Sequence, residues 1–480
     1  MKYETVIGLE THVELATKSK IFCACANDHT AGQNENVCPA CCGMPGMLPV
    51  TNKRVVELGM TAGMLLNCRI NRYTTFDKKS YYYPDLPCAY QITQWVSPIA
   101  VQGSVEIETS AGKRTIGIKQ IHMEEDAGKL VHDDWTDSSL VDFNRTSVPL
   151  IEIVSKPDLR SVEEVVAYLE KLRSLLRFAR VSECRFETGT MRCDVNLSIR
   201  PVGTEALGVR TEMKNMASIS AISRAIAYEI ARHTDALELG TETLVQETRR
   251  WDDTRGMSFA MRNKETAADY RYFPDPNLVP VVVDDAWFDR VAASLPEPAA
   301  EKKARYLKDY GLTEADAGQL TASRALCDAF EGALAVYSQP KELAAWLLGD
   351  CMSLLRKKQL TADELVIDPV KLGALVRLNA EGKVNRNAAR RILAAVVEED
   401  ADPAAYAEAN GLLSQGDESA VAAVIAQVLA EDAKSVADYR AGKLKARQAL
   451  FGKTMKALKG NGDPAVIEKL LQAALDKLDG

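Results

Sequence analysis

The sequence predicts an α+β protein in which a sheet-rich N-terminal cradle domain is followed by an all-helical domain and an all-helical tail. Up to about residue 285, short segments of alternating polarity are interrupted by Gly, Pro and Asn, which is typical of strands. All five histidines and nine of the 11 cysteines lie in this part. After Pro296-Glu-Pro298 the composition changes to Ala, Leu, Glu and Lys with helical periodicity. We therefore expect domains at residues 1–293, 294–405 and 406–480.

The first strand carries the first candidate catalytic residues. Within residues 6–15, alternation places apolar side chains on one face and Glu10 and His12 on the other. The same pattern puts Asp194 and Glu212 on the polar faces of two later segments. A solvated sheet edge explains one such pattern as well, but its recurrence predicts that several strands offer acidic groups to one cleft.

Four cysteines in two close pairs predict a structural metal site. Cys23-Ala-Cys25 is followed, twelve residues later, by Cys38-Pro-Ala-Cys41. Thiolates favour zinc, and four of them close a tetrahedral coordination sphere, so no position is left for a substrate. Four ordinary thiols are the alternative, because C-x-C departs from the usual C-x-x-C first pair. Cys42 is the spare thiol next to the second pair.

Glu124, Glu125 and Glu152 are the next acidic candidates. Glu152 interrupts an apolar run, where a carboxylate needs a cation or hydrogen-bond donors. An ion pair with Arg145 and a role as metal ligand are both open. Alternation predicts that Glu124 shares a face with His122 while Glu125 faces the other way. A solvated acidic face is the alternative for this run.

These acidic residues suit a hard cation such as magnesium, which takes oxygen ligands and usually keeps waters and phosphate oxygens. His12 is atypical for magnesium, so a weak ligand, a donor to phosphate and a neighbour of the ligands are all open interpretations. The pooled set is Glu10, His12, Glu124, Glu125, Glu152, Asp194 and Glu212.

Two helices are expected inside the sheet-rich domain. One lies between Pro157 and Ala179, where Ser161 can act as the N-cap and apolar residues recur at helical spacing. The second spans about residues 218–233. Further along, the turn-forming residues at 400–403 mark the boundary before the tail.

Composition describes an ordinary soluble protein, with 46% hydrophobic and 26% charged residues and a net charge of −8. No apolar run reaches the length of a membrane span. The odd number of cysteines and the lack of a secretory apolar segment favour the reducing cytoplasm. No nucleophile loop of amidase type is visible, so any nitrogen-releasing step is assigned to a partner.

Six motifs in a fixed order resemble the family of B subunits of the aspartyl/glutamyl-tRNA amidotransferases. Their order and spacing are far more specific than any one of them, and they span nearly the full chain. The motifs are Gly8-Leu-Glu-Thr-His12, Asn36-Val-Cys-Pro-Ala-Cys41, the segment 76–87, Ile121-His-Met-Glu-Glu-Asp-Ala-Gly-Lys129, Val141-Asp-Phe-Asn-Arg145 with Pro149-Leu-Ile-Glu-Ile153, and Asp269-Tyr-Arg-Tyr-Phe-Pro274.

The resemblance implies a heterotrimer in which an A subunit liberates ammonia from glutamine and a small C subunit contacts both other chains. The B subunit would bind misacylated Glu-tRNA(Gln), Asp-tRNA(Asn) or both. It would use ATP to phosphorylate the side-chain carboxylate, and ammonia would displace the phosphate. The expected enzyme is a carbon–nitrogen ligase with glutamine as amido-N donor, in which magnesium neutralises charge during phosphoryl transfer.

The resemblance also assigns roles to residues. It implies magnesium ligation by Glu10, His12, Glu125 and Glu152, with Asp194 and Glu212 completing the catalytic set near ATP or a second metal. It places the ammonia passage at Lys79, Tyr82 and Glu125, with a Lys79–Glu125 pair as a gate. It matches the zinc site to Cys23, Cys25, Cys38 and Cys41.

Two further points concern the expected partners. Thr146-Ser147 stands where this family usually has Ala-Gly, so a turn that needs glycine is in doubt there. Basic side chains in the tail form an electrostatic footprint for tRNA, although a solvated helix face is equally ordinary. A zinc-stabilised RNA-binding protein without catalysis is the competing interpretation of the whole chain. The tail candidates are Lys443, Lys445, Lys453, Lys456 and Lys459.

Overall fold

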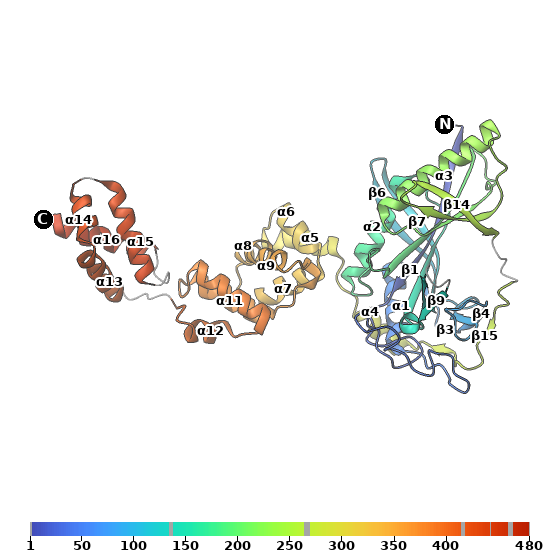
Figure 1. Ribbon diagram of the computed structural model, residues 1–480, viewed down its shortest axis with the longest axis horizontal. Helices are drawn as coiled ribbons and strands as arrows, with labels where there is room; N and C mark the ends of the chain where they lie inside the picture. The colour runs from blue at the N-terminus through green and yellow to red at the C-terminus, as the bar shows by residue number, and fades with distance from the viewer. Residues whose placement is uncertain are drawn as a thin grey trace. The chain divides into compact units, whose positions relative to one another are not determined.

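The computed structural model describes residues 2–133, 138–263, 269–413, 418–441, 443–458 and 464–479 (Figure 1). The chain divides into two compact units, Met1–Pro296 and Glu297–Gly480, close to the expected boundary after residue 293. The first unit is rich in strands, and the described part of the second contains helices only. The predicted fold class is confirmed. Within the described ranges, no helix combines the length and the apolar character needed to cross a membrane.

A nine-stranded sheet forms the centre of the first unit, in the order β14-β13-β12-β11-β1-β10-β7-β6-β2. Strand β1 therefore lies in the middle of the sheet, between β10 and β11, and pairs antiparallel with both. The strands of this sheet are β1 (Tyr3–Glu14), β2 (Arg69–Ile70), β6 (Ala100–Thr109), β7 (Gly112–Glu125), β10 (Pro149–Ser155), β11 (Met191–Pro201), β12 (Thr211–Lys214), β13 (Glu247–Asp252) and β14 (Met257–Asn263).

One face of this sheet is covered by helices. Ile7, Leu9 and Val13 of β1 are buried in the same hydrophobic core as apolar side chains of α1 (Lys53–Leu65), α2 (Val162–Phe178) and α3 (Ile219–Leu239). The alternation predicted for the first strand is thus confirmed on its apolar side. Glu10, His12 and Glu14 alternate with these residues and face away from this core.

Both helices expected in this unit are present. The Ser161 side chain accepts a hydrogen bond from the backbone N–H of Glu164 and caps α2. Ser218 caps α3 in the same way. Helix α3 runs past the expected end near residue 233 to Leu239, because Ala236 is still buried, and it ends at Gly240 in the left-handed conformation.

Shorter elements surround the large sheet. The three-stranded sheet of β15, β4 and β5 lies against the large sheet through the contact of β5 with β7. It forms part of a cavity on the large sheet. The remaining elements of the first unit are β3 (Tyr73–Thr74), β4 (Asp77–Ser80), β5 (Tyr90–Thr93), β8 (Lys129–Asp133), β9 (Ser138–Asp142), a 3-10 turn (Phe143–Arg145), β15 (Phe273–Pro274), β16 (Val281–Val282) and α4 (Asp285–Ala293).

The second unit contains two groups of helices. The last four form a hydrophobic cluster of their own, with buried side chains from α13, α15 and α16. A division near residue 405 stays a prediction. The helices are α5 (Ala299–Tyr310), α6 (Glu314–Thr321), α7 (Arg324–Leu334), α8 (Pro340–Ala345), a π-helical turn (Trp346–Cys351), α9 (Met352–Lys357), a 3-10 turn (Ala362–Glu364), α10 (Pro369–Ala380), α11 (Arg386–Glu399), α12 (Pro403–Ala409), α13 (Glu418–Glu431), α14 (Ala433–Arg440), α15 (Leu444–Ala457) and α16 (Pro464–Asp479).

A buried histidine on α3 predicts acid sensitivity of the first unit. The Nε2 atom of His233 lies 2.8 Å from Oγ1 of Thr211. Burial, reinforced by the charge of Arg232, lowers the pKa of His233 from 6.5 to about 4. Between these values the unfolded chain binds more protons at this position than the folded chain, so stability rises with pH, by at most about 1.4 kcal/mol per pH unit.

We therefore expect His233→Gln to flatten the pH dependence of thermal unfolding between about pH 4.5 and 6.5. Differential scanning calorimetry of wild type and variant across this range measures the effect. His132→Gln, at an exposed histidine, is the control and is expected to follow the wild-type curve. A His233→Gln curve parallel to that of wild type would contradict the assignment.

Candidate functional site

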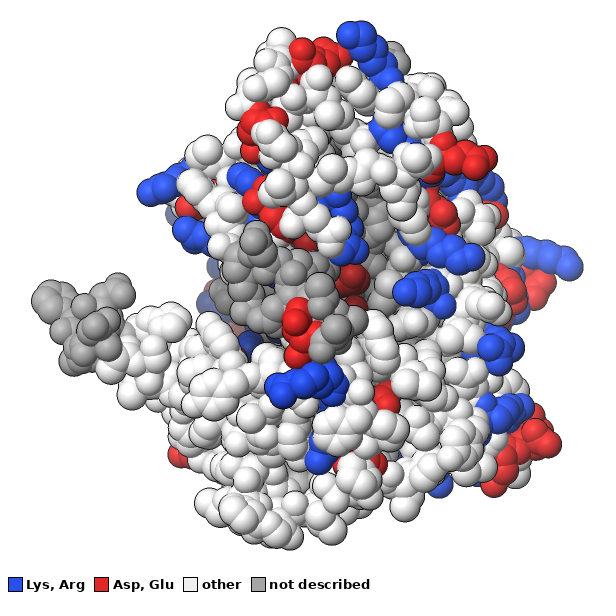
Figure 2. All heavy atoms as spheres, turned by 90° about the vertical axis from the view of Figure 1, so that its right-hand side faces the viewer, with Lys and Arg blue, Asp and Glu red and all other residues white. Residues whose placement is uncertain are grey.

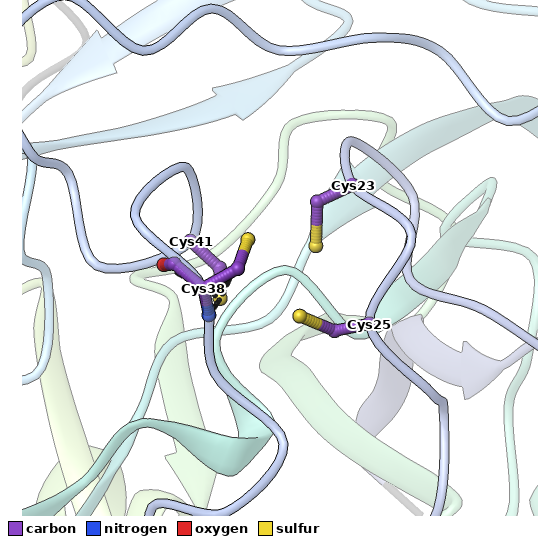
Figure 3. A group of neighbouring side chains, drawn as sticks. All are labelled: Cys23, Cys25, Cys38 and Cys41. Carbon is purple, nitrogen blue, oxygen red and sulfur yellow. Dashed lines mark hydrogen bonds between the residues drawn. The ribbon is translucent and has the colours of Figure 1, made fainter.

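The four predicted zinc ligands converge in space. The sulfur atoms all lie within 4.8 Å of one another; they belong to Cys23, Cys25, Cys38 and Cys41. Figure 3 shows that the two pairs come from two facing loops and that their sulfur atoms point toward one another. The Cys38 and Cys41 sulfur atoms are 3.8 Å apart. Four sulfur ligands at about 2.3 Å from a tetrahedral zinc ion need about this separation, so the residues fit zinc.

The chemistry of Cys41 also fits a metal thiolate. A hydrogen bond with Cys23, together with the backbone N–H of Cys38 and the charge of Lys20, lowers the pKa of Cys41 to about 4. These contacts favour the thiolate form of Cys41, which is the form that binds a metal ion. The Lys20 ammonium is fully buried, lies 3.7 Å from the Cys41 sulfur and donates to the backbone carbonyls of Asn36 and Phe143.

Lys20 offsets the negative charge of this cluster. Four thiolates around a divalent ion carry a net charge of about −2, which is costly beneath a protein surface unless a cation lies nearby. We expect Lys20→Met to weaken zinc binding by roughly 10- to 100-fold, as measured by competition with a chromophoric chelator. Lys18→Met is the control, because Lys18 is exposed on the same segment. Equal zinc retention in the two variants would contradict this role.

A second cluster lies on the polar face of the large sheet. The antiparallel register pairs His12 of β1 with Glu152 of β10, and Glu152 with His122 of β7. Glu124 follows two residues after His122 and shares its face. His12 Nε2 lies 3.3 Å from a Glu124 oxygen and 3.5 Å from a Glu152 oxygen, and His122 Nε2 lies 3.5 and 3.0 Å from the same two carboxylates. We call these four residues the histidine–glutamate cluster.

Charge coupling dominates this cluster. Burial alone would lower the pKa of both histidines, but the charge of Glu152 and hydrogen bonds to Glu124 and Glu152 outweigh it. The pKa of His12 is thereby raised well above its usual value, and that of His122 is raised to about 9. Burial opposes ionisation of the two carboxylates as well, yet the histidines hold both carboxylate pKa values below their usual range. His12, Glu124 and Glu152 can also converge on one metal ion.

A third cluster consists of Glu10, Asp194 and Glu212, which we call the tri-carboxylate cluster. Glu10 of β1 pairs with Asp194 of β11, and Asn196 of β11 pairs with Glu212 of β12. One oxygen of each carboxylate lies within 4.8 Å of the others. Lys214 contacts two members, with its Nζ 2.5 Å from Asp194 and 3.1 Å from Glu212. Three oxygen donors with a net negative charge fit a hard divalent cation.

Both clusters line a single cavity of about 490 Å³. Lys79, Lys119, Arg210 and Lys214 also line it, so cations share this cavity with the acidic groups. Figure 2 shows a hollow in the N-terminal unit with acidic atoms inside it and basic side chains nearby. Such a cavity offers carboxylates for metal ions together with cations for phosphate oxygens.

The structure does not bring Glu125 to the predicted magnesium ligands. Its side chain lies on the other face of β7, where it accepts hydrogen bonds from the backbone N–H of Ile92 and from Oγ of Ser147. Burial raises the pKa of Glu125 to about 7. Glu124 occupies the place expected for Glu125, since side chains alternate along a strand. Glu10 is likewise separated from His12 and Glu152 and belongs to the tri-carboxylate cluster.

Ser147 keeps a backbone conformation typical of glycine. Its φ is +63°, in the left-handed region that costs a non-glycine residue about 1–2 kcal/mol. The doubt about a glycine turn at this position is resolved, because the turn forms with serine. The Ser147 hydroxyl donates to Glu125 at 2.6 Å, and this contact offsets part of the strain.

The predicted passage residues lie apart from one another. Lys79 lines the cavity and lies over the rings of Tyr81 and Tyr270, at 5.6 and 4.9 Å from their centroids. The gate expected between Lys79 and Glu125 is not seen in this arrangement, because Glu125 is held by other donors on the far face of β7. Tyr82 is 86% exposed, whereas its neighbour Tyr81 lines an adjoining pocket.

The ion pair between Glu152 and Arg145, which was the alternative to a metal-ligand role for Glu152, is not formed. Arg145 instead pairs with Asp126 at 3.3 Å and donates to the backbone carbonyls of Ala127 and Gly128. His122 and Lys214 contact the clusters but are not among the site residues predicted from the sequence. Alternation along β7 was a signal for His122, since it shares the parity of Glu124. The role of Lys214 depends on the pairing of β11 with β12, which the sequence does not reveal.

Two of the tail lysines are engaged in ion pairs. Lys443 contacts Asp438 at 2.9 Å, and Lys453 contacts Asp432 at 2.6 Å. Lys445 and Lys456 are exposed on α15 and lie eleven residues apart, about three turns, on one side of the helix. Lys459 lies outside the described residues.

A cavity lined by two convergent carboxylate clusters and several cations has the side chains that a catalytic domain for anionic substrates needs. Residues 5–289 match the family described as the GatB/GatE catalytic domain, and residues 328–475 match the GatB domain. The chain therefore belongs to the family of B subunits of the aspartyl/glutamyl-tRNA(Asn/Gln) amidotransferases. This result confirms the family that the sequence motifs indicate.

Individual relatives match over their whole length. The chain is 50% identical to the B subunit of the aspartyl/glutamyl-tRNA(Asn/Gln) amidotransferase of Lachnoclostridium phytofermentans over 475 residues, which cover 99% of each chain. The protein with the same name in Agathobacter rectalis is 50% identical over 473 residues, covering 98% of this chain and 99% of its own. The corresponding protein of Caldicellulosiruptor bescii is 46% identical over 481 residues, covering 100% of both.

Proposed function

We propose that this protein activates the side-chain carboxylate of Glu-tRNA(Gln), Asp-tRNA(Asn) or both by ATP-dependent phosphorylation in the cavity of the large sheet. Ammonia then displaces the phosphate and forms the amide. The observation that supports this most directly is the presence of two carboxylate clusters and several cations in one cavity. A carboxylate resists attack by an amine until one of its oxygens becomes a good leaving group, so an activation step is needed.

Each cluster has a distinct part in this proposal. The tri-carboxylate cluster would hold magnesium, and His12, Glu124 and Glu152 would hold a second metal ion. Bound magnesium neutralises charge on the transferred phosphoryl group. Lys119 and Arg210, which line the same cavity, would bind phosphate oxygens.

Lys214 holds Asp194 and Glu212 in place, which keeps their oxygen atoms directed at a common point. Carboxylates held in this way need little rearrangement when a metal ion or substrate binds. The four-cysteine cluster would bind zinc as a structural ion and fix the loop that follows β1.

Family membership implies further subunits and tRNA as partners. We propose that an A subunit supplies ammonia from glutamine and that a C subunit contacts both chains. Ammonia would reach the cavity beside Lys79 and Tyr81, and the role of Glu125 and Tyr82 in its passage remains a proposal. The eleven cysteines all lie in the described residues and form no disulfide, which fits the reducing cytoplasm that we propose as the location of this protein.

The test is to assay the assembled enzyme with ATP, glutamine and either Glu-tRNA(Gln) or Asp-tRNA(Asn). We expect amide formation with at least one of them, with ADP and phosphate released in proportion. In the absence of ammonia and glutamine, radiolabelled γ-phosphate is expected to appear on the aminoacyl group. Amide formation that does not need ATP would overturn the proposal.

The tail is proposed to bind tRNA through the exposed lysines of α15. We expect the double variant Lys445→Glu, Lys456→Glu to weaken tRNA binding and to reduce the slope of log K against log salt concentration. Filter binding at several salt concentrations measures both effects. Lys443→Glu is the matched control, because Lys443 is already paired with Asp438. Unchanged affinity and slope in the double variant would rule out this face of the tail.

A further inference from the structure

A group of aromatic side chains forms part of the wall of the catalytic cavity. Trp95, Tyr270 and Tyr272 all line it. The Trp95 and Tyr272 rings are stacked, with centroids 4.4 Å apart and planes inclined by 12°. Tyr270 meets Tyr272 edge to face at 6.0 Å. Trp95 is still 51% exposed although Tyr272 is stacked on its ring, so much of its surface remains accessible to a ligand.

The backbone that carries the Trp95 ring is held by several hydrogen bonds. The backbone N–H groups of Trp95 and Val96 both donate to one carboxylate oxygen of the buried Asp77, at 2.7 and 3.0 Å. The preceding residue, Gln94, is buried, and its side-chain oxygen accepts from the backbone N–H groups of Ile99 and Met123. A large aromatic surface left exposed on a fixed segment is a preorganised binding element, because little conformational entropy is lost when a ligand covers it.

The ring also lies close to the proposed reaction centre. Thr93, at the end of β5, donates a hydrogen bond from Oγ1 to a Glu124 oxygen at 3.3 Å. Trp95 follows two residues later, so at most about 7 Å of chain separates it from the residue that contacts the histidine–glutamate cluster. The cluster and the ring line the same cavity, so a ligand stacked on Trp95 can extend toward that cluster.

We propose that the stacked pair of Trp95 and Tyr272 binds the 3′-terminal adenine of the aminoacyl-tRNA. This inference rests on the proposed function, in which the carboxylate of the esterified amino acid reacts in this cavity. The amino acid is attached to the ribose of the terminal nucleotide, so the base of that nucleotide must lie close to the reacting carboxylate. The adenine of ATP is held further from the transferred phosphoryl group, by its ribose and two more phosphates.

Stacking suits this recognition task. Aromatic rings bind the flat face of a base without reading its neighbours, and each stacked base contributes enough to change affinity about 5- to 150-fold. All tRNAs end in the same adenosine, so a platform of this kind serves Gln- and Asn-accepting tRNAs alike. The cations of the cavity wall complement the terminal phosphates.

The test is a binding cycle with the assembled enzyme and uncharged tRNA(Gln), either intact or lacking its 3′-terminal adenosine. We expect wild type to bind the shortened tRNA about tenfold more weakly than the intact one. Trp95→Ala is expected to bind both tRNAs equally, at the weaker level, whereas Trp95→Phe retains most of the discrimination. Tyr73→Ala is the matched control, because Tyr73 is an exposed aromatic residue of the same unit that does not line the cavity.

Three outcomes would overturn the inference. They are a wild-type enzyme that does not distinguish the two tRNAs, a Trp95→Ala variant that discriminates as well as wild type, and a Trp95→Ala variant whose KM for ATP alone rises. The last result would assign the ring to the adenine of ATP. Because the binding cycle involves no chemical step, it remains informative even if the proposed phosphorylation proves wrong. Unchanged zinc content and melting temperature of each variant exclude a folding defect as the cause of lost binding.

Discussion

Replacement of Glu152 by glutamine is expected to lower the rate of ATP-dependent amide formation at least about a hundredfold. Glu152 contacts both His12 and His122, and it is one of three residues that can converge on a metal ion. The amide of glutamine keeps the size of the side chain but lacks the negative charge, so both histidines lose their main counter-charge and the metal loses a ligand. Single-turnover assays of the assembled enzyme at saturating tRNA and ATP measure this effect.

The control for this variant is Glu14→Gln. Glu14 lies two residues beyond His12 on the same face of β1 but contacts His29 outside the cluster, so we expect activity close to wild type. The two adjacent glutamates of β7 provide a second comparison. Glu124→Gln is expected to shift the magnesium dependence of the reaction in the same direction as Glu152→Gln, whereas Glu125→Gln is expected to leave it unchanged. Full activity of Glu152→Gln would remove the catalytic assignment and favour an RNA-binding role for the cavity.

Loss of one zinc ligand is expected to produce the largest change in stability. Cys38→Ser removes a sulfur that lies 3.8 Å from Cys41 in a cluster of four. Structural zinc contributes directly to folding free energy, and we expect a loss of at least about 3 kcal/mol, which corresponds to a fall in melting temperature of roughly 5–10 °C. Metal analysis is expected to give one zinc per wild-type chain and much less in the variant.

Cys42→Ser is the matched control for the zinc site. Cys42 is the next residue after Cys41 but does not belong to the four-sulfur cluster, so its replacement is expected to change neither zinc content nor melting temperature. Activity of Cys38→Ser is expected to fall only in proportion to the folded fraction, because the cysteine cluster lies apart from the carboxylate clusters. Wild-type stability of a zinc-free Cys38→Ser chain would show that the four thiols have no structural role.

The elements of the protein could be read from local patterns. The apolar and polar alternation of β1, the serine caps of α2 and α3 and the change of composition near residue 296 are all short-range features, and the structure confirms them. The cysteine quartet was also predictable, because its two pairs lie within one short segment and their chemistry restricts the partner.

It was harder to predict from the sequence which residues belong to each catalytic cluster. Glu10 and His12 are two residues apart and share a face, so the sequence favours a common role for them. In the structure they face different neighbours, since β11 brings Asp194 to Glu10 while β10 brings Glu152 to His12. The choice between Glu124 and Glu125 depends likewise on which face of β7 meets the cavity, although alternation had already predicted that they diverge.

The fold class, the family and the types of side chain available for chemistry follow from composition, periodicity and motifs along the chain. Which of those side chains act together depends on how the strands are arranged in space. Strand order and register are long-range properties, and they arranged seven acidic and basic groups into two separate clusters within one cavity. They also set Glu125 on the opposite face of β7 and brought the half-exposed Trp95 to the wall of the same cavity, a position that no local pattern predicts.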